Sequence, residues 1–333
     1  MATDGTAALA IAFHGHGTGV FADGFAELVE RPVEVRVLDL ALADPAERAW
    51  FERAEVVVGA TLNDAMPVPA AARLYHSVGA GYDRIAVDRL PAGCALCNCY
   101  GHEAPMAEYV TAALLNRHLP FAEADARLRR GDWSLGLGRA AALRGEWSGS
   151  RLGVVGYGPL GREIARKAAA FDVVVHAANR SEVHDPERVA RWWPLDRLAA
   201  MCAQVDALVV ALPATPQTAG LVDAACFAAL PAHAVVVNVG RGAVVDEDAL
   251  YDALAERRIA GAVIDTWYVY PSAERPRTVP AHRPFHELDN VLMTPHFSGW
   301  TRGLVRRRQR LMAENVRRLA SGEPPLNQVW PPR

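Results

Sequence analysis

The sequence predicts an α/β fold with two doubly wound parallel-sheet domains. Short apolar runs alternate along most of the chain with segments of helical periodicity, which is the pattern of parallel strands buried on both faces. The length of 333 residues corresponds to about two domains. Midway along the chain, a glycine-rich motif follows an apolar strand and precedes a helical stripe, which favours a dinucleotide-binding domain.

We expect two series of strands with a helical stretch between them. This stretch covers residues 105–130 and has Pro105 in its first turn, where proline is tolerated. A final helix over 301–321 has no strand of its own to follow and could pack on either domain. Six strands in the second series place the dinucleotide-binding domain there, with a smaller α/β domain before it. The expected strands are 7–13, 33–38, 55–59, 74–77 and 95–98, then 152–155, 173–177, 207–211, 235–239, 262–265 and 291–294.

Composition and charge exclude several classes of protein. Hydrophobic residues make up 51% and charged residues 22% of the chain, which is ordinary for a globular protein and argues against disorder. A net charge of −3 argues against a nucleic-acid partner. No apolar run approaches the roughly 18 residues needed to cross a membrane. The N-terminus lacks the basic start of a signal peptide, so we expect a cytoplasmic protein.

The cysteine pattern is typical of a strand rather than of a metal site. Cys94, Cys97 and Cys99 include a C-x2-C pair that could hold zinc. No second pair of cysteines or histidines follows at finger-like spacing, and small apolar side chains suit a buried strand. We therefore expect no metal.

The most informative segment is the glycine loop at 156–161. Gly156, Gly158 and Gly161 form G-x-G-x-x-G directly after an apolar strand, with Pro159 and Leu160 opening the following helix. Glycines allow the backbone to approach a pyrophosphate at the N-terminus of a helix. A second glycine cluster, at 15–19, has the wrong spacing for a dinucleotide and is interpreted as a loop after the first strand; contact with the substrate is the alternative.

The end of the next strand bears on the choice of cofactor. NAD-binding domains place an acidic residue there for the adenosine ribose, but residues 173–181 contain no Asp or Glu. Asn179, Arg180 and Ser181 could instead donate hydrogen bonds to a 2′-phosphate. The alternative is a turn of no functional consequence. We expect NADP to be favoured over NAD.

Three further strand ends should converge on the same edge of the second sheet. Asp265 ends an expected strand, and Arg241 and His296 each come just after one. Ligands of open α/β sheets bind outside the carboxyl ends of strands. The guanidinium of Arg241 could bind a carboxylate, and His296 could transfer a proton near neutral pH. Asp246 is expected to cap the helix that follows Arg241.

These motifs resemble the D-isomer-specific 2-hydroxyacid dehydrogenase family, which includes glyoxylate/hydroxypyruvate reductases, phosphoglycerate dehydrogenase, phosphite dehydrogenase and formate dehydrogenase. The resemblance runs from about residue 77 to residue 327. It rests on 77–83 (SVGAGYD), Asn98, Ala107-Glu108, the glycine loop, 213–218 (PATPQT), 238–242 (NVGRG), 261–265 (GAVID) and 294–296 (TPH).

The resemblance implies a Rossmann cofactor domain, 102–297, inserted into a flavodoxin-like substrate domain made of 1–101 and 298–333. It also implies an NAD(P)-dependent enzyme that reduces a small 2-oxo acid to the D-2-hydroxy acid, with a homodimer formed through the cofactor domain. His296 would donate the proton as the nicotinamide delivers hydride, and Asp265 would lie by the nicotinamide amide. The implied substrate-binding residues are Gly79, Ala80, Gly81, Asn98, Arg241 and His296. The implied cofactor-binding residues are Gly156, Gly158, Pro159, Leu160, Gly161, Asn179, Arg180, Ser181, Leu212, Pro213, Thr218, Val239, Gly240, Arg241, Asp265, His296, Ser298 and Gly299.

One departure from the family pattern lies beside the expected catalytic histidine. The family places a glutamate before the proline that follows the aspartate, where it pairs with the histidine, but this chain has Tyr270 there. We therefore count Tyr270 with Arg241 and His296 as catalytic. A neutral tyrosine cannot support an imidazolium by charge, although Glu274 or Glu287 could replace the missing carboxylate.

Two other functions stay open at this point. Formate dehydrogenases have glutamine in place of the glutamate and share the His-x-Ser-Gly run seen at 296–299, so oxidation of formate or phosphite is the alternative reaction. Corepressors of the same fold bind peptides without turnover; they keep the glutamate, which makes a binding-only function less favoured.

Overall fold

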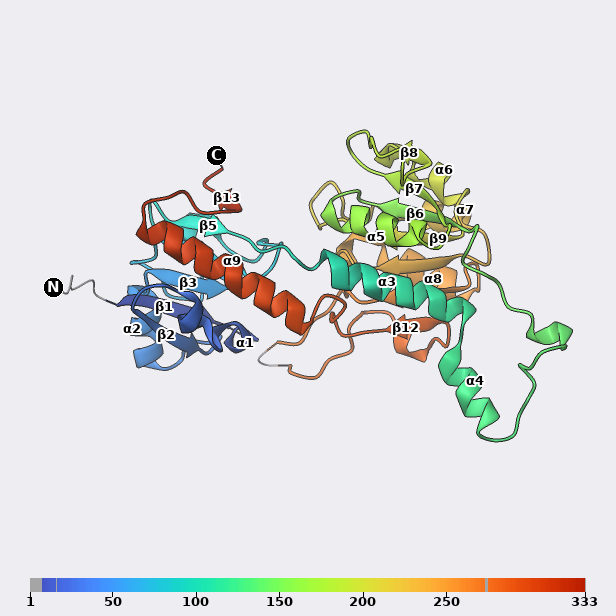
Figure 1. Ribbon diagram of the computed structural model, residues 1–333, viewed down its shortest axis with the longest axis horizontal. Coiled ribbons are helices and arrows are strands. Elements are labelled where there is room, and N and C mark those ends of the chain that lie inside the picture. The colour runs from blue at the N-terminus through green and yellow to red at the C-terminus, as the bar shows by residue number, and fades with distance from the viewer. Residues whose placement is uncertain (1–7, 16, 273–274, 333) are drawn as a thin grey trace. The chain divides into compact units, whose positions relative to one another are not determined.

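The computed structural model describes residues 8–15, 17–272 and 275–332. The chain divides into two compact units, which are described separately (Figure 1). The first unit comprises Met1–Gly101 and Trp300–Arg333, and the second comprises His102–Gly299.

The first unit contains a sheet in the order β13-β5-β4-β3-β1-β2. The first five strands along the chain are parallel and follow the order 2-1-3-4-5, which is the doubly wound order of flavodoxin-like domains. Strand β13 pairs antiparallel with β5 at the edge. The strands are β1 (Leu9–His14), β2 (Val33–Leu38), β3 (Val56–Gly59), β4 (Leu74–His76), β5 (Ala95–Cys97) and β13 (Gln328–Trp330).

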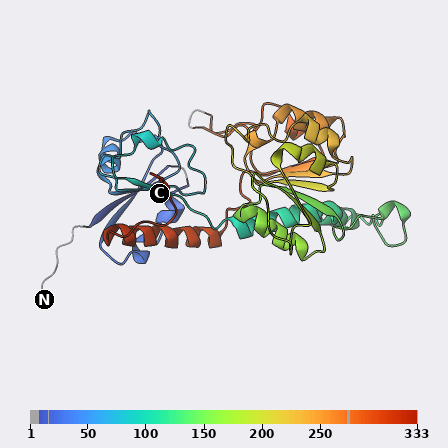
Figure 2. The ribbon, with the colours of Figure 1, turned by 90° about the horizontal axis from the view of Figure 1, so that it is seen from above.

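Helices cover both faces of this sheet. Alternate residues of β1 point to opposite faces, so Ala12 packs on the side of α2 and Phe13 on the side of α9. Helix α9 lies along the face of the sheet to which Phe13 points (Figure 2), and it contributes Met312 and Val316 to the core there. The final helix, whose partner the sequence left open, therefore belongs to the first unit. Its helices are α1 (Gly19–Ala22), α2 (Pro45–Arg53) and α9 (Arg302–Ala320), with short 3-10 helices at Phe25–Leu28 and Val87–Arg89.

A buried polar network fixes α9 to the first sheet. His76 on β4 is fully buried, and its Nε2 accepts a hydrogen bond from Asn315 Nδ2 at 3.0 Å. The same Asn315 side chain bonds the backbone of Leu326 through both its oxygen and its nitrogen. Burial lowers the pKa of His76 from 6.5 to about 4, so the ring is neutral in the folded protein at pH 7.

The second unit contains a parallel sheet in the order β12-β11-β10-β9-β6-β7-β8. Read from β8, the order along the chain is 3-2-1-4-5-6-7, which is the doubly wound order of dinucleotide-binding domains with one added strand. Its strands are β6 (Arg151–Val155), β7 (Val174–Ala178), β8 (Arg191–Trp193), β9 (Ala207–Val210), β10 (Val235–Asn238), β11 (Gly261–Ile264) and β12 (Val291–Met293).

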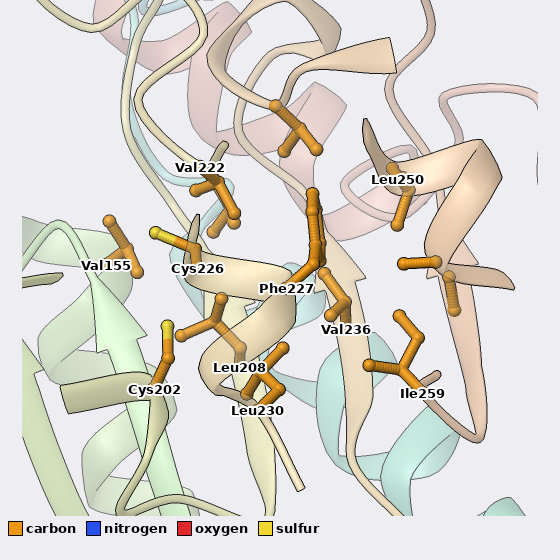
Figure 3. Packing of buried hydrophobic residues seen from close by; sticks show 14 of the residues in the cluster. Val155, Cys202, Leu208, Val222, Cys226, Phe227, Leu230, Val236, Leu250 and Ile259 are labelled. Atoms are coloured by element: carbon orange, nitrogen blue, oxygen red, sulfur yellow. The ribbon is translucent and has the colours of Figure 1, made fainter. Parts of the chain in front are cut away.

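Apolar side chains pack this sheet against helices on both faces. On one face, Phe227 of α7 and Leu250 of α8 meet strand residues such as Val236 (Figure 3). Asp246 caps α8 by accepting a hydrogen bond from Ala249 N, as expected. No helix in the described part of the chain is long and apolar enough to span a membrane. The helices are α3 (Glu103–His118), α4 (Phe121–Leu128), α5 (Pro159–Ala169), α6 (Leu198–Cys202), α7 (Ala224–Ala229) and α8 (Glu247–Ala255), with 3-10 helices at Ala140–Ala142, Leu195–Arg197, Gly242–Val244 and Phe285–Glu287.

The helical stretch expected over 105–130 is confirmed, and it consists of two helices rather than one. Helix α3 starts earlier, at Glu103, and ends at His118; α4 begins at Phe121. Pro120 disfavours helical backbone in the residue before it, and Leu119 has φ −124° and ψ 75°. The chain therefore leaves the α3 axis at this point.

The expected strands are confirmed, but two short strands were missed. The three-residue strands β8 and β13 each lie at the edge of a sheet. Such short segments carry too few residues to show a two-residue periodicity.

We predict that the first unit loses stability as the pH falls from about 6.5 toward 4. The unfolded chain protonates His76 below about 6.5 while the folded chain does not, so the unfolded state binds more protons in this window. The loss at pH 5 relative to pH 7 should be about 2 kcal/mol. Urea unfolding at both pH values measures this difference. It should shrink in His76→Gln and persist in His184→Gln, whose ring is exposed; an unchanged difference in His76→Gln would contradict the assignment.

Candidate active site

The carboxyl ends of the parallel strands place several predicted site residues on one edge of the second sheet. Gly156 follows β6, Arg241 lies three residues beyond β10, Asp265 follows β11, and His296 lies three residues beyond β12. All these strands run in the same direction, so the loops that follow them lie on the same side of the unit.

The glycine loop has the geometry required for close approach of a ligand. Gly156 has φ +99°, a left-handed conformation that favours glycine. A Cβ on Gly161 would lie 2.2 Å from the carbonyl oxygen of Gly156, so only glycine lets α5 start this close to β6. By contrast, a Cβ on Gly158 would meet nothing within 4 Å. The loop is closed toward the sheet and open at its outer turn.

The same edge contains unsatisfied polar groups that fit a nicotinamide cofactor. Within the described residues, Ser298 Oγ and Thr266 Oγ1 are buried and have no hydrogen-bond partner. Buried hydroxyls without partners are costly unless a ligand completes them. Thr218 is different, because its hydroxyl donates to the carbonyl of Pro213 at 2.7 Å and fixes the turn after Leu212.

The turn at 179–181 holds the glycine loop from the side. Asn179 Oδ1 accepts a hydrogen bond from Tyr157 N at 3.4 Å, and Asn179 Nδ2 donates to the carbonyl of Ser181 at 3.1 Å. The Asn179 amide is thus engaged within the protein. Arg180 and Ser181 are exposed and remain the groups of this turn that face solvent.

His296 is held in an unusual backbone conformation by a buried carboxylate. It has φ +57°, which is uncommon for a residue other than glycine and needs support from its surroundings. Asp265 has no solvent exposure, and its carboxylate accepts hydrogen bonds from Phe297 N and Ser298 N, each at 3.0 Å. It also accepts one from Thr294 Oγ1 at 2.6 Å. Asp265 therefore fixes the residues on both sides of His296.

The ring of His296 contacts the tyrosine that departs from the family pattern. Tyr270 OH lies 2.8 Å from His296 Nδ1, and it also accepts a hydrogen bond from Trp267 N at 3.1 Å. Of the two carboxylates suggested as replacements, Glu287 lies 3.9 Å from His286, and Glu274 lies outside the described residues. The described partner on Nδ1 is thus a neutral hydroxyl.

Three effects shift the pKa of the His296 ring. Desolvation by the surrounding protein lowers the pKa of the ring below 6.5 and is the largest effect. The charge of Asp265 raises this pKa, and the charge of Arg241 lowers it. The carboxylate that supports the imidazolium is therefore Asp265, and the guanidinium is close enough for its charge to act on the ring.

The loop that holds Arg241 is braced by Asn238. The side-chain amide of Asn238 donates to the carbonyl of Arg241 at 3.2 Å and accepts from Gly240 N at 3.1 Å. Arg241 Nη1 donates to the carbonyl of Gly240 at 2.9 Å, and the side chain is half-buried. The remaining guanidinium N–H groups can bind a carboxylate.

The predicted substrate loop of the first unit is a turn fixed by two polar side chains. Ser77 Oγ donates to the carbonyl of Gly81 at 2.9 Å, and Asn98 Nδ2 donates to the carbonyl of Ala80 at 2.8 Å. The turn after β1 is closed by Thr18, whose hydroxyl donates to the carbonyl of Gly15 at 2.7 Å; His16, within the second glycine cluster, lies outside the described residues.

Two residues near Asp265 were not found from the sequence. Tyr109 OH on α3 lies 2.7 Å from Thr294 Oγ1, which in turn bonds Asp265. The position of Thr294, two residues before His296, could have drawn attention to it. Nothing in the linear sequence points to Tyr109, because the contact joins residues 185 positions apart.

Comparison with known proteins agrees with this geometry. The family model described as D-isomer specific 2-hydroxyacid dehydrogenase, NAD binding domain, matches residues 111–298. D-3-phosphoglycerate dehydrogenase of Mycobacterium leprae is 32% identical over 302 residues, covering 87% of this chain and 54% of that protein. The chain therefore spans about half the length of this curated relative.

Solved structures show the same fold. An NADPH-dependent glyoxylate/hydroxypyruvate reductase from Sinorhizobium meliloti, in complex with NADP and malonate, is 26% identical with a TM-score of 0.77 and 97% of each chain covered. A D-isomer specific 2-hydroxyacid dehydrogenase from Xanthobacter autotrophicus Py2, in complex with NADPH and MES, is 28% identical with a TM-score of 0.75, covering 97% of this chain and 98% of the other. The family model covers more than half of the chain, including the glycine loop and the Arg241–Asp265–His296 edge. The protein belongs to the D-isomer specific 2-hydroxyacid dehydrogenase family.

Proposed function

We propose that this protein reduces a small 2-oxo acid to the D-2-hydroxy acid with a nicotinamide cofactor, and that Arg241, His296 and Tyr270 are its catalytic residues. The observation that carries the proposal is the arrangement at the sheet edge. A histidine is held at φ +57° by a buried carboxylate, and the charge of Arg241, which lies beyond the end of β10, acts on its ring.

Each residue has a defined task in this proposal. A bound nicotinamide supplies hydride to the carbonyl carbon of the substrate. Arg241 binds the substrate carboxylate through its free N–H groups and orients the carbonyl. His296 donates the proton that the carbonyl oxygen takes up, and Tyr270 holds the ring through Nδ1 so that Nε2 is the donating atom.

The cofactor is assigned to the glycine loop and the nearby strand ends. The open turn at Gly158 receives the pyrophosphate at the start of α5. The unpartnered hydroxyl of Ser298 offers a hydrogen bond to the nicotinamide amide, and Asp265 lies beside it. In the first unit, the Gly79–Gly81 turn and Asn98 are the groups assigned to the substrate carboxylate.

A second reaction is favoured by one observation. Tyr270 gives His296 a neutral partner, which suits the oxidation of formate or phosphite because hydride removal there needs no proton relay. The two reactions differ in whether a protonated His296 is required. A protein that only binds its ligand would not need the fixed arrangement of His296 and Arg241, so we do not favour that function.

We also propose that NADP is the preferred cofactor. The strand end after β7 has no acidic residue, and Arg180 and Ser181 are exposed beside the glycine loop. A carboxylate would repel a 2′-phosphate, whereas a guanidinium attracts it. Two solved relatives are complexes with NADP or NADPH, which supports the assignment.

The second unit has an exposed apolar segment that we assign to a homodimer contact. The segment 119–143 leaves the body of the unit at the end of α3 (Figure 1) and carries large apolar side chains that its own unit leaves in solvent. Several large apolar side chains exposed in one segment favour an interaction site. The side chains are Phe121, Leu128, Trp133, Leu135, Leu137 and Leu143.

Arg241→Ala and His296→Ala should each abolish most of the reductase activity. Arg241→Ala should raise KM for the 2-oxo acid, and His296→Ala should lower kcat by about 10²–10⁴, the usual contribution of a positioned general acid. Steady-state rates with glyoxylate and NADPH measure both effects. Arg258→Ala, which removes a partly exposed arginine that pairs with Glu256 in the same unit, is the control. Near-parental rates in both site variants would refute the active-site assignment.

Arg180→Ala should weaken NADPH selectively. A charge-assisted contact to phosphate contributes about 1.5–3 kcal/mol, so kcat/KM for NADPH should fall about ten- to a hundredfold while that for NADH changes little. Arg166→Ala removes another surface arginine, which pairs with Glu163, and should leave both cofactors unaffected. Equal losses with NADH and NADPH would contradict the role of Arg180.

The molecular mass of the protein in solution tests the proposed homodimer. Sedimentation equilibrium should give twice the 36.0 kDa of one chain. Trp133→Ser combined with Leu137→Ser should lower the measured mass toward that of a single chain, because both side chains are exposed in one chain. A parental protein that sediments as a monomer at micromolar concentration would rule the contact out.

A further inference from the structure

We propose that Tyr109 is a positioning residue for His296 and acts through a directed chain of hydroxyl hydrogen bonds that ends on Asp265. The inference rests on the proposed role of His296 as proton donor. Tyr109 lies on α3, far from His296 in the sequence, and its hydroxyl bonds Thr294 at the end of β12 rather than the ring of His296. Its effect passes through Thr294 and Asp265.

The direction of the chain follows from the number of protons available. Thr294 has one hydroxyl proton and donates it to Asp265 Oδ1 at 2.6 Å, since a carboxylate can only accept. The oxygen of Thr294 is then the acceptor for Tyr109, whose hydroxyl lies 2.7 Å away. Tyr109 therefore donates to Thr294, and Thr294 donates to Asp265.

The hydroxyl of Tyr109 is suited to be the first donor of this chain. Burial raises the pKa of Tyr109 to about 12, so its proton stays in place over the pH range in which His296 titrates. The ring packs edge-on against Phe297, with centroids 5.8 Å apart, which fixes the position of the hydroxyl. Helix α3 thus brings a permanent donor to the end of β12.

The chain fixes Asp265 where its charge can act on His296. Thr294 and Phe297 N both bond Oδ1, and Ser298 N bonds Oδ2, so each oxygen of the carboxylate is tied to residues that flank the histidine. Without the Thr294 bond, the carboxylate retains only the two backbone amides, one on each oxygen, and its position is held by one hydrogen bond fewer. Its support of the imidazolium would then weaken.

Three groups in the described part of the chain face His296. Asp265 follows β11 and raises the pKa of the ring, Arg241 follows β10 and lowers it, and Tyr270 contacts Nδ1 without charge. Since desolvation already lowers this pKa, Asp265 is the favourable charge. Weaker support from Asp265 must therefore lower the pKa of His296 further.

The test compares variants that remove single hydroxyls from the chain. Tyr109→Phe and Thr294→Val should shift the falling limb of the kcat/KM profile for glyoxylate with NADPH by about half a pH unit toward lower pH. At pH values above the falling limb, kcat/KM should be about threefold lower than in the parental protein, and on the low-pH plateau it should be unchanged. Thr294→Ser keeps the hydroxyl donor, so its falling limb should lie at the same pH as in the parental protein.

Two control variants remove hydroxyls that lie outside the chain. Thr111→Val is on the same helix, where its hydroxyl donates to the carbonyl of Ala107, and Tyr251→Phe lies on α8 against Phe285. Neither should move the limb. An equal loss of rate at all pH values in Tyr109→Phe, with an unmoved limb, would show a merely structural role and overturn the proposal.

A second measurement separates this inference from the proposed reaction. Proton NMR titration of the ligand-free protein gives the pKa of His296 directly, with the resonance identified by its loss in His296→Gln. Tyr109→Phe should lower this pKa by about half a unit. An unchanged pKa would overturn the positioning role even if the enzyme is active. A lowered pKa would support it even if the wild-type protein reduced no 2-oxo acid, and that result would count against the proposed reaction alone.

Discussion

The carboxylate of Asp265 organises the functional edge of the second sheet. A buried charge is tolerated only when hydrogen-bond donors surround it, because the desolvation of an unpaired carboxylate costs several kcal/mol. Here the donors are Thr294, Phe297 N and Ser298 N, all within five residues of one another. Satisfying the charge therefore bends the chain after β12 and presents His296 at a positive φ. One electrostatic requirement at the end of β11 thus determines where the proton donor lies.

Much of the fold could be predicted because its signals are local. Apolar runs bounded by turn residues gave eleven strands, and the glycine spacing after β6 identified the dinucleotide-binding unit. The errors also have local causes. The strands β8 and β13 are too short for periodicity, and the break between α3 and α4 depends on Pro120, whose effect on Leu119 was overlooked within an otherwise helical pattern.

The site was only partly accessible from the sequence. Strand ends could be placed on a common edge, because this follows from parallel topology. Side-chain partners could not, since they depend on packing between distant elements. Asn179, interpreted as a phosphate ligand, uses its amide to brace Tyr157 N and the Ser181 carbonyl, and the Tyr109–Thr294 contact joins α3 to the end of β12. Such contacts leave no periodicity or regular spacing in the sequence, so they could not be predicted from it.

The placement of α9 sets an order of events during synthesis. Residues 102–299 form a contiguous unit that can complete its sheet as soon as it leaves the ribosome. The first sheet, although translated earlier, lacks the helix that supplies Met312, Ala313 and Val316 to its core and Asn315 to His76. Its apolar face therefore stays open while more than two hundred residues are added. In the cell, this nascent face is where we expect chaperones to bind, and premature termination would leave the N-terminal sheet unfolded.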